Sequence, residues 1–436
     1  MSKDILSILH DLASRDLSDE ETARALLDLT LQAAPPEVAD AVRVCALPAW
    51  FDADLLALLI TTPSPIQHFL AKIRRAFRAK TARKIDVSDR NKRRAAALLE
   101  RMAAFSFVMP REGGGYVYHE ATRERLLDWW RKPENRSRFA ALADRLARYY
   151  LALADEQVPR LSGPAYLEAL AALDRAYPNV RAAWEGVVEV SNEELVRDFA
   201  YALADYQDRR GLWVEKIRWT QEGLAACERM GDEAGTAAMQ NNLGIAYRNL
   251  PTGDRAANLR QAIACYQEAL RFYTPEAAPL QYAGTQNNLG AAYQSLPTGD
   301  RAANLARAIE CYQQALRFYT PEAAPLQYAT TQNNLGNAYS DLPTGDRAAN
   351  LKQALECAEA ALQVKGLAPW EWAEYSFTRG LIHLALGHLD RALADYQAGV
   401  PLATAITIAE ALKELDKFAA AHPDTPGLDA VRALLT

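Results

Sequence analysis

Apolar residues recur at three- and four-residue spacings along almost the entire chain, and alternation of apolar and polar positions is rare. The first pattern is typical of amphipathic helices and the second of strands, so the sequence predicts a mainly α protein. LPTGD at residues 250–254 predicts a turn between helices, with Asp254 as the cap of the next helix. TPE at residues 274–276 predicts a further helix start, because a capping hydroxyl precedes a proline in the first turn.

The helical pattern repeats with a fixed period. Residues 286–331 match residues 240–285 at 38 of 46 positions, and a third copy begins at Gln332 and diverges after Leu351. A fixed period of this size predicts a solenoid of stacked helix pairs. Small residues alternate with large ones, so that paired helices can approach closely while large side chains fill the space between pairs. In the first copy the small residues are Gly244, Ala262 and Ala269, and the large ones are Leu243, Tyr247 and Tyr266.

This alternation resembles the tetratricopeptide repeat, which has a period of about 34 residues. The copies here are longer because LPTGDRAAN is inserted in the turn between the two helices of each pair. Gly380, Gly387, Ala392 and Tyr396 follow the usual spacing without the insertion, and a looser pair spans residues 194–229. The resemblance implies a right-handed α-solenoid of roughly five helix pairs, closed by capping helices beyond residue 400.

Two adjacent asparagines recur on the first helix of each copy, namely Asn241, Asn242, Asn287, Asn288, Asn333 and Asn334. A ladder of amide side chains can bind the backbone of an extended peptide without reading its sequence. Similar asparagines bind peptide backbones in tetratricopeptide proteins that resemble kinesin light chains. The resemblance therefore implies a groove for a protein or peptide partner, to which Arg248 also contributes. The alternative is that one asparagine of each pair bonds the neighbouring copy or the LPTGD turn.

A different pattern covers residues 35–130. PPEVADAVRVCALPAWFDADLLALLI predicts two helices, and RNKRRAAALLERMAAF predicts a third. SFVMPR and YVYHE, joined by the glycine turn EGGG, predict a hairpin, and ATRERLLDWW predicts another helix. Helices followed by a hairpin describe a winged-helix domain. The hairpin region is followed by the helical stretches FAALADRLARYYLALADE and LDRAYPNVRAAWE and then by the helix pairs. Over residues 35–400, this order of segments resembles the winged-helix and repeat half of STAND-class (NB-ARC-like) bacterial regulators.

STAND proteins carry a P-loop NTPase before the winged helix, but GxxxxGK[ST] does not occur in this sequence. His119 matches a histidine that contacts nucleotide in many STAND proteins, whereas Tyr118 and Glu120 depart from the usual Met and Asp. Without an NTPase in the sequence, we expect His119 to order the hairpin and the following helix rather than to bind nucleotide. The sequence predicts no cofactor.

Eleven basic residues lie between Lys72 and Arg94, opposed only by Asp86 and Asp89. In DNA-binding winged helices, cations at the start of the helix before the wing contact the groove or neutralise phosphates. The segment therefore predicts contact with a nucleic acid or an acidic partner protein, and the alternative is a solvated basic insertion. The candidate residues are Arg74, Arg75, Arg78, Arg90, Lys92, Arg93 and Arg94.

Composition and motifs narrow the function further. The chain of 436 residues has a formal net charge of −6, which argues against a protein that coats nucleic acid with its whole surface. Its five cysteines are scattered and form no CxxC pair, which favours a reducing cytoplasm over disulfides or a zinc site. No run of 18 apolar residues and no signal-peptide core occur, so no membrane contact is expected. Neither GxSxG nor HExxH is present, and no catalytic or metal site is predicted.

The sequence thus predicts N-terminal helices at 1–34, a winged-helix-like domain at 35–132 with a basic insertion at 66–94, a helical linker bundle at 133–192, a tetratricopeptide solenoid at 193–400 and capping helices at 401–436. The favoured function is a non-enzymatic scaffold with a regulatory or sensing role, in bacteria often beside defence modules, that binds a protein or peptide in the solenoid groove. The alternative is a transcription regulator that binds DNA through the winged helix and senses through the repeats. The sequence leaves open the partner, the oligomeric state and whether an NTPase or effector enzyme acts in trans.

Overall fold

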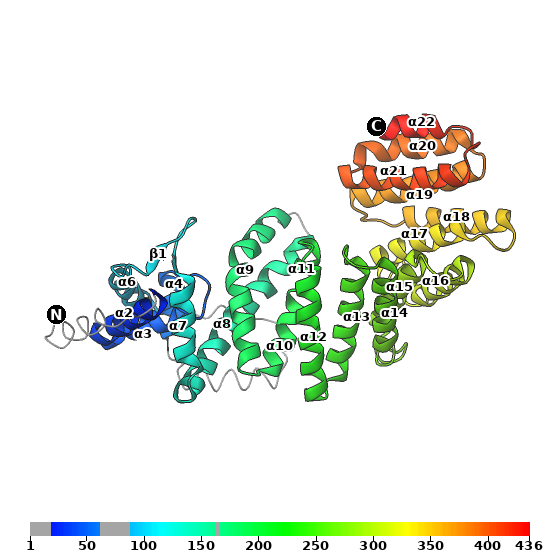
Figure 1. Cartoon of the computed structure of the whole chain (residues 1–436). Helices are drawn as coiled ribbons and strands as arrows, with labels where there is room; N and C mark the ends of the chain where they lie inside the picture. Colours follow the sequence, from blue (N-terminus) through cyan, green and yellow to red (C-terminus); the bar gives the residue numbers. More distant parts are fainter. Residues whose placement is uncertain (1–18, 62–87, 163–164) are drawn as a thin grey trace. The chain divides into compact units, whose positions relative to one another are not determined.

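A computed structural model describes residues 19–61, 88–162 and 165–436. The described chain is mainly α-helical, and its C-terminal part is a solenoid of successive helix pairs, as predicted (Figure 1). It divides into two compact units. The first unit comprises the described residues up to Gly211 together with Ala225–Met230. The second unit comprises Leu212–Leu224 and Gly231–Thr436. In the described ranges, no helix has both the length and the apolar content needed to cross a membrane.

The first unit contains the helices and the hairpin that the sequence predicts for residues 35–130. The strands pair antiparallel, with Val108 opposite Tyr118, and an additional bridge joins Phe51 to Tyr116. Gly113, Gly114 and Gly115 connect the strands with positive φ angles, which glycine adopts without steric cost. The elements are α2 (Asp19–Ala33), α3 (Pro36–Val44), α4 (Ala53–Ile60), α6 (Asp89–Met102), β1 (Val108–Pro110), β2 (Tyr116–Tyr118), α7 (Glu120–Arg131), η1 (Pro133–Asn135), α8 (Arg136–Gln157), η2 (Val158–Ser162), α9 (Tyr166–Glu189), α10 (Glu193–Ala202) and α11 (Ala204–Arg209).

One buried amide ties α9 to the segment between α3 and α4. The side chain of Asn179 is fully buried, its Oδ1 accepts from the Trp50 N–H (2.9 Å), and its Nδ2 donates to the Trp50 carbonyl (3.0 Å). The same Nδ2 donates to the hydroxyl of Tyr150 on α8 (2.8 Å). Nearby, Trp130 on α7 donates its indole N–H to the carbonyl of Arg43 (2.7 Å). Helices α7 and α9 therefore satisfy backbone groups of the α3–α4 region, and α8 supports the buried amide through Tyr150.

The second unit is built from helix pairs that pack in chain order. The pairs are α13·α14, α15·α16, α17·α18 and α19·α20, and the first helices of consecutive pairs also touch one another. Helix α12 (Trp213–Met230) is shared between the two units. The remaining helices are α13 (Glu233–Asn249), α14 (Arg255–Ala269), α15 (Pro279–Ser295), α16 (Arg301–Leu316), α17 (Pro325–Asp341), α18 (Arg347–Leu362), α19 (Pro369–Ala385), α20 (Leu389–Gly399), η3 (Val400–Leu402), α21 (Ala405–Ala421) and α22 (Leu428–Leu435).

The inserted turn has the same local chemistry in each copy. Gly253, Gly299 and Gly345 have φ angles of 80°, 83° and 83°, so the turn favours glycine there. Asp254 caps α14 as predicted, because its side chain accepts from the Ala256 N–H at 2.8 Å. Asp300 and Asp346 cap α16 and α18 in the same way.

The helix start predicted at residues 274–276 is wrong. The hydroxyl of Thr274 accepts from the Ala277 N–H (3.2 Å) and closes only a single turn. Helix α15 begins at Pro279, and Ala278 before it has a non-helical backbone. A second proline in the first turn of α15 supplies the start that the sequence pattern assigned to Pro275.

The last two helices, α21 and α22, do not continue the regular stacking of helix pairs. Helix α21 packs against α19, and α22 packs against α20 and α21. Ala411 and Leu415 of α21 enter a buried cluster with Phe377 of α19 and Tyr396 of α20. At the far end of α21, Lys417 reaches the last residue of α17, Asp341 (2.9 Å). One face of α21 is thereby held against the first helices of two pairs.

Candidate functional site

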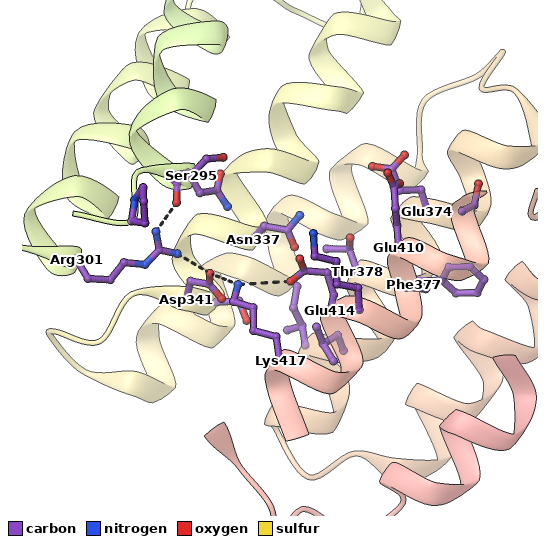
Figure 2. Close-up of a pocket in the computed structure, with 18 of the residues that line it drawn as sticks. Ser295, Arg301, Asn337, Asp341, Glu374, Phe377, Thr378, Glu410, Glu414 and Lys417 are labelled. Carbon is purple, nitrogen blue, oxygen red and sulfur yellow. Dashed lines mark hydrogen bonds and ion pairs between the residues drawn. The ribbon is translucent and has the colours of Figure 1, made fainter. Parts of the chain in front are cut away.

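A pocket of about 650 Å³ lies where α21 faces the solenoid (Figure 2). Its walls come from the C-terminal ends of α15 and α17, from the inserted turn at residues 296–300, from α19 and from α21. Most of its polar lining comes from Arg301, Asn337, Asp341, Glu374, Thr378, Glu410, Lys413, Glu414 and Lys417. Charged groups of both signs therefore surround one open space.

One end of the pocket is a closed network of ion pairs. Asp341 accepts from Arg301 Nη2 (2.9 Å) and from Lys417 Nζ (2.9 Å), and Lys417 also contacts Glu414 (3.4 Å). Arg301 in addition donates to the carbonyl of Gln294 at the end of α15. Burial alone would lower the pKa of Lys417, but the Asp341 and Glu414 carboxylates outweigh it and the pKa is raised. The charges at this end satisfy one another and hold α21 in place.

The other end carries two carboxyl groups, Glu374 of α19 and Glu410 of α21 (Figure 2). Among the described residues, neither carboxylate has a cation within ion-pair distance, although Lys413 lies one helical turn from Glu410. Burial, together with the charges of Glu410 and Glu371, raises the pKa of Glu374 to about 7. This end of the pocket has a negative charge without a counter-ion.

The floor of the pocket is aromatic. Phe377 and Tyr396 are 4% and 1% exposed, and their rings stack with centroids 5.2 Å apart. Leu381 and Ile382 extend this apolar surface along α19. A ligand in the pocket would therefore meet an apolar floor between two differently charged ends.

The three copies differ from one another at the positions that line this space. Over residues 240–259, 286–305 and 332–351, the copies are identical except at three positions. These positions are spaced i, i+3 and i+4, so they lie on one helical face. We call them the variable face, and its residues are Ile245, Arg248 and Asn249 in α13, Ala291, Gln294 and Ser295 in α15, and Asn337, Ser340 and Asp341 in α17.

All polar residues of the variable face line a hollow. Those of α15 and α17 line the pocket, and Arg248 and Asn249 of α13 line a second, more open hollow of about 480 Å³ with Trp213 and Pro251. The internal repeat would have indicated these residues, because positions that vary between nearly identical copies stand out in the sequence. Sequence analysis selected only Arg248 among them. It also missed α21, which lies outside the repeat.

The recurring asparagines form hydrogen bonds between neighbouring copies. Asn288 Nδ2 donates to Asn241 Oδ1 (3.3 Å), and Asn334 Nδ2 donates to Asn287 Oδ1 (3.2 Å). Arg248 Nη1 also reaches Asn288 Oδ1 (3.5 Å). This is the alternative that the sequence left open for these residues. Binding of a peptide backbone by the asparagines stays a prediction.

The ladder ends at the third copy. The residue that corresponds to Asn334 in α19 is Thr378, two positions before Gly380. Asn333 is 2% exposed, and its Oδ1 has no hydrogen-bond partner among the residues described. Asn242 is half-buried, and neither asparagine lines the pocket.

The predicted basic residues divide into two groups. Arg74, Arg75 and Arg78 lie outside the described residues. Arg90, Lys92, Arg93 and Arg94 are exposed on the first turns of α6, and none forms an ion pair with a described acidic residue. His119 is exposed before α7, and its imidazole makes no hydrogen bond to the described part of the chain. Within that part, no group of three or more His, Cys, Asp or Glu side chains could hold a metal ion.

No family model matches the chain, and no curated protein matches it in sequence. Among solved structures, the apo form of the quorum sensor NprR from B. thuringiensis is similar at 16% identity and a TM-score of 0.43, covering 64% of this chain and 70% of that one. NprR in complex with its cognate peptide NprX is similar at 15% identity and a TM-score of 0.44. The match covers 73% of this chain and 90% of that one. The STAND protein with a tetratricopeptide repeat sensor PH0952 from Pyrococcus horikoshii is similar at 13% identity and a TM-score of 0.33. The match covers 97% of this chain and 62% of that one. A likeness at this level says nothing of what the chain binds.

Proposed function

We propose that the protein is a non-enzymatic interaction scaffold with a regulatory or sensing role, which binds an extended segment of a partner protein across the variable face. The observation that carries this proposal is the contrast between the two kinds of position in the copies. Four of the repeated asparagines, Asn241, Asn287, Asn288 and Asn334, join the copies to one another, whereas the polar residues that vary line the pocket and the second hollow. Duplication alone does not direct substitutions on α13, α15 and α17 to one half-buried face.

The arrangement suits an elongated ligand better than a compact one. The hollows lie on α13, α15 and α17, and consecutive members of this set touch side by side. A chain in extended conformation could place successive side chains against successive copies. The copies offer different groups at the same place, such as Arg248, Gln294 and Ser340, which would distinguish successive side chains of the ligand.

Selection from a displayed library of random dodecapeptides tests the proposal directly. We expect the full chain to enrich a consensus, and the double variant Asn337→Ile, Ser340→Arg to weaken binding of the consensus peptide by about tenfold or more. Both new residues already occupy the same positions in α13, so the helix tolerates them. Isothermal titration with the synthetic peptide measures the loss.

The matched control exchanges residues outside the pocket. Lys352→Ala with Glu356→Ala introduces alanines found at the same positions of α16 and α14, and both sites are exposed on α18. This variant should bind the consensus peptide as well as the original chain does. A library that yields no consensus, or a consensus that the pocket exchange leaves unaffected, would exclude the variable face as a binding surface.

A second candidate function is DNA binding through the winged-helix-like region, and one observation favours it. Arg90, Lys92, Arg93 and Arg94 are exposed cations at the start of α6, and none pairs with an acidic residue in the part of the chain that the structure describes. The double reversal Arg93→Glu, Arg94→Glu should abolish binding to duplex DNA if α6 contacts phosphates, and leave peptide binding unchanged. Fluorescence anisotropy at two salt concentrations measures this. Equal DNA affinity of the variant and the original chain would reject the role of α6.

A further inference from the structure

The carboxyl groups of the pocket are not equivalent in their surroundings. Asp341 and Glu414 have cationic partners within 2.9 Å and 3.4 Å. Arg379, the cation nearest in sequence to Glu374, is committed to Asp395 through contacts as short as 2.5 Å. Glu374 and Glu410 are left without a partner in the described chain, although Glu374 is only partly accessible to water. A half-buried carboxylate without a counter-ion is unfavourable, and a cation from a ligand would relieve it.

We infer that the pocket binds a lysine or arginine side chain of the partner segment, with its cationic head between Glu374 and Glu410. This inference rests on the proposed function and specifies what the pocket selects. The two carboxylates come from different helices, α19 and α21, and both line the pocket (Figure 2). Charge complementarity of this kind contributes more to specificity than to overall affinity.

The rest of the pocket fits the remainder of such a side chain. The methylene groups of lysine or arginine can lie along apolar surface while the charged head stays at polar groups. Leu381 of α19, a partly exposed residue of the pocket lining, supplies such a surface. The opposite end cannot take the same cation, because Arg301 and Lys417 already neutralise Asp341. The basic side chain therefore has one place in the pocket.

A peptide pair tests this inference. The consensus peptides from the random library should share a lysine or arginine at one fixed position. Replacing that residue by norleucine should weaken binding to the original chain about tenfold. The same replacement should change the affinity for the Glu374→Gln, Glu410→Gln double variant by less than about twofold, because the partners of the cation are gone.

Two further variants test whether the loss of binding comes from the pocket carboxylates rather than from misfolding. Glu410→Gln alone changes an exposed residue, so this variant should fold normally. It should still lose part of the preference for the basic peptide over the norleucine peptide. Glu310→Gln, on the exposed face of α16, should retain the full preference for the basic peptide. Peptides that need the variable face but carry no basic residue would overturn the inference and leave the proposed function intact. Failure to recover any peptide would overturn both.

The pH dependence gives an independent readout. Below about pH 7 Glu374 holds a proton, because burial and the neighbouring carboxylates raise its pKa to about 7. The affinity for the basic peptide should therefore fall between pH 8 and pH 6, and the affinity for the norleucine peptide should stay constant. The other charged groups that line the pocket are Arg301, Asp341, Glu410, Lys413, Glu414 and Lys417. A fall of equal size for both peptides would contradict a cation at Glu374.

Discussion

We expect Gly290→Ala to destabilise the solenoid by about 2 kcal/mol, and Gly336→Ala to change its stability by less than about 0.5 kcal/mol. A Cβ atom at Gly290 would lie 2.8 Å from Cε1 of Tyr312 and 3.1 Å from the carbonyl oxygen of Ala308. Tyr312 is fully buried and donates to Gln294 Oε1 (2.7 Å), so its ring cannot move without loss of packing and of this hydrogen bond. These losses exceed the gain of about 1 kcal/mol from the higher helix propensity of alanine.

Gly336 is a control at the same position of the next copy. There the tyrosine is replaced by Ala358, and a Cβ would meet the Ala354 carbonyl at 3.1 Å and Cys357 Cβ at 3.4 Å. The carbonyl contact is the same in both copies, so the comparison isolates the tyrosine ring. Urea unfolding of the full chain, combined with hydrogen exchange of α15 and α17, measures both effects. Equal losses at the two glycines would mean that the ring does not decide the spacing of the helices.

We expect Asn179→Ala to destabilise the first unit by about 3 kcal/mol. The substitution removes both hydrogen bonds to the backbone of Trp50 and the bond to the Tyr150 hydroxyl. Because the amide is fully buried, its loss leaves a small cavity and three polar groups with unmet hydrogen bonds. The effect should appear as faster amide exchange at Trp50 and a lower midpoint of unfolding for the first unit.

Tyr150→Phe separates the parts of this network. It removes only the hydroxyl that Asn179 contacts and keeps the buried ring, so we expect a loss of about 1 kcal/mol. Exchange at the Trp50 amide should remain slow in this variant. If Asn179→Ala and Tyr150→Phe cost the same, the amide does not act by holding the α3–α4 segment.

Local features of the sequence were sufficient for much of the fold. The inserted turn repeats a glycine and a capping aspartate, and the hairpin has three consecutive glycines, so both could be placed without knowledge of tertiary contacts. The start predicted at Thr274 failed because its hydroxyl caps a single turn that does not continue. A capping pattern alone does not show whether the helix after it extends.

The candidate site was harder to predict because half of it lies outside the repeat. Lys417 and Asp341 are 76 positions apart, and only the packing of α21 brings them together. Glu374 and Glu410 likewise become neighbours through tertiary structure, and carboxylates on amphipathic helices otherwise resemble ordinary solvent-facing residues. The asparagines drew attention through their regularity, yet regularity in a repeat also follows from a contact that every copy makes with the next.

That contact makes the copies interchangeable. Asn241 meets Asn288 through the same atoms with which Asn287 meets Asn334. Unequal recombination within the gene could therefore remove the middle copy and bring Asn241 opposite Asn334, with each junction unchanged. The span of the solenoid could lengthen or shorten by whole units of 46 residues in this way, while α17, α19 and α21 would stay together at the pocket and Arg248 and Asn249 would take the places of Gln294 and Ser295. The number of copies would then set the reach of the solenoid, whereas Glu374 and Glu410, which lie outside the copies, would be kept at any length.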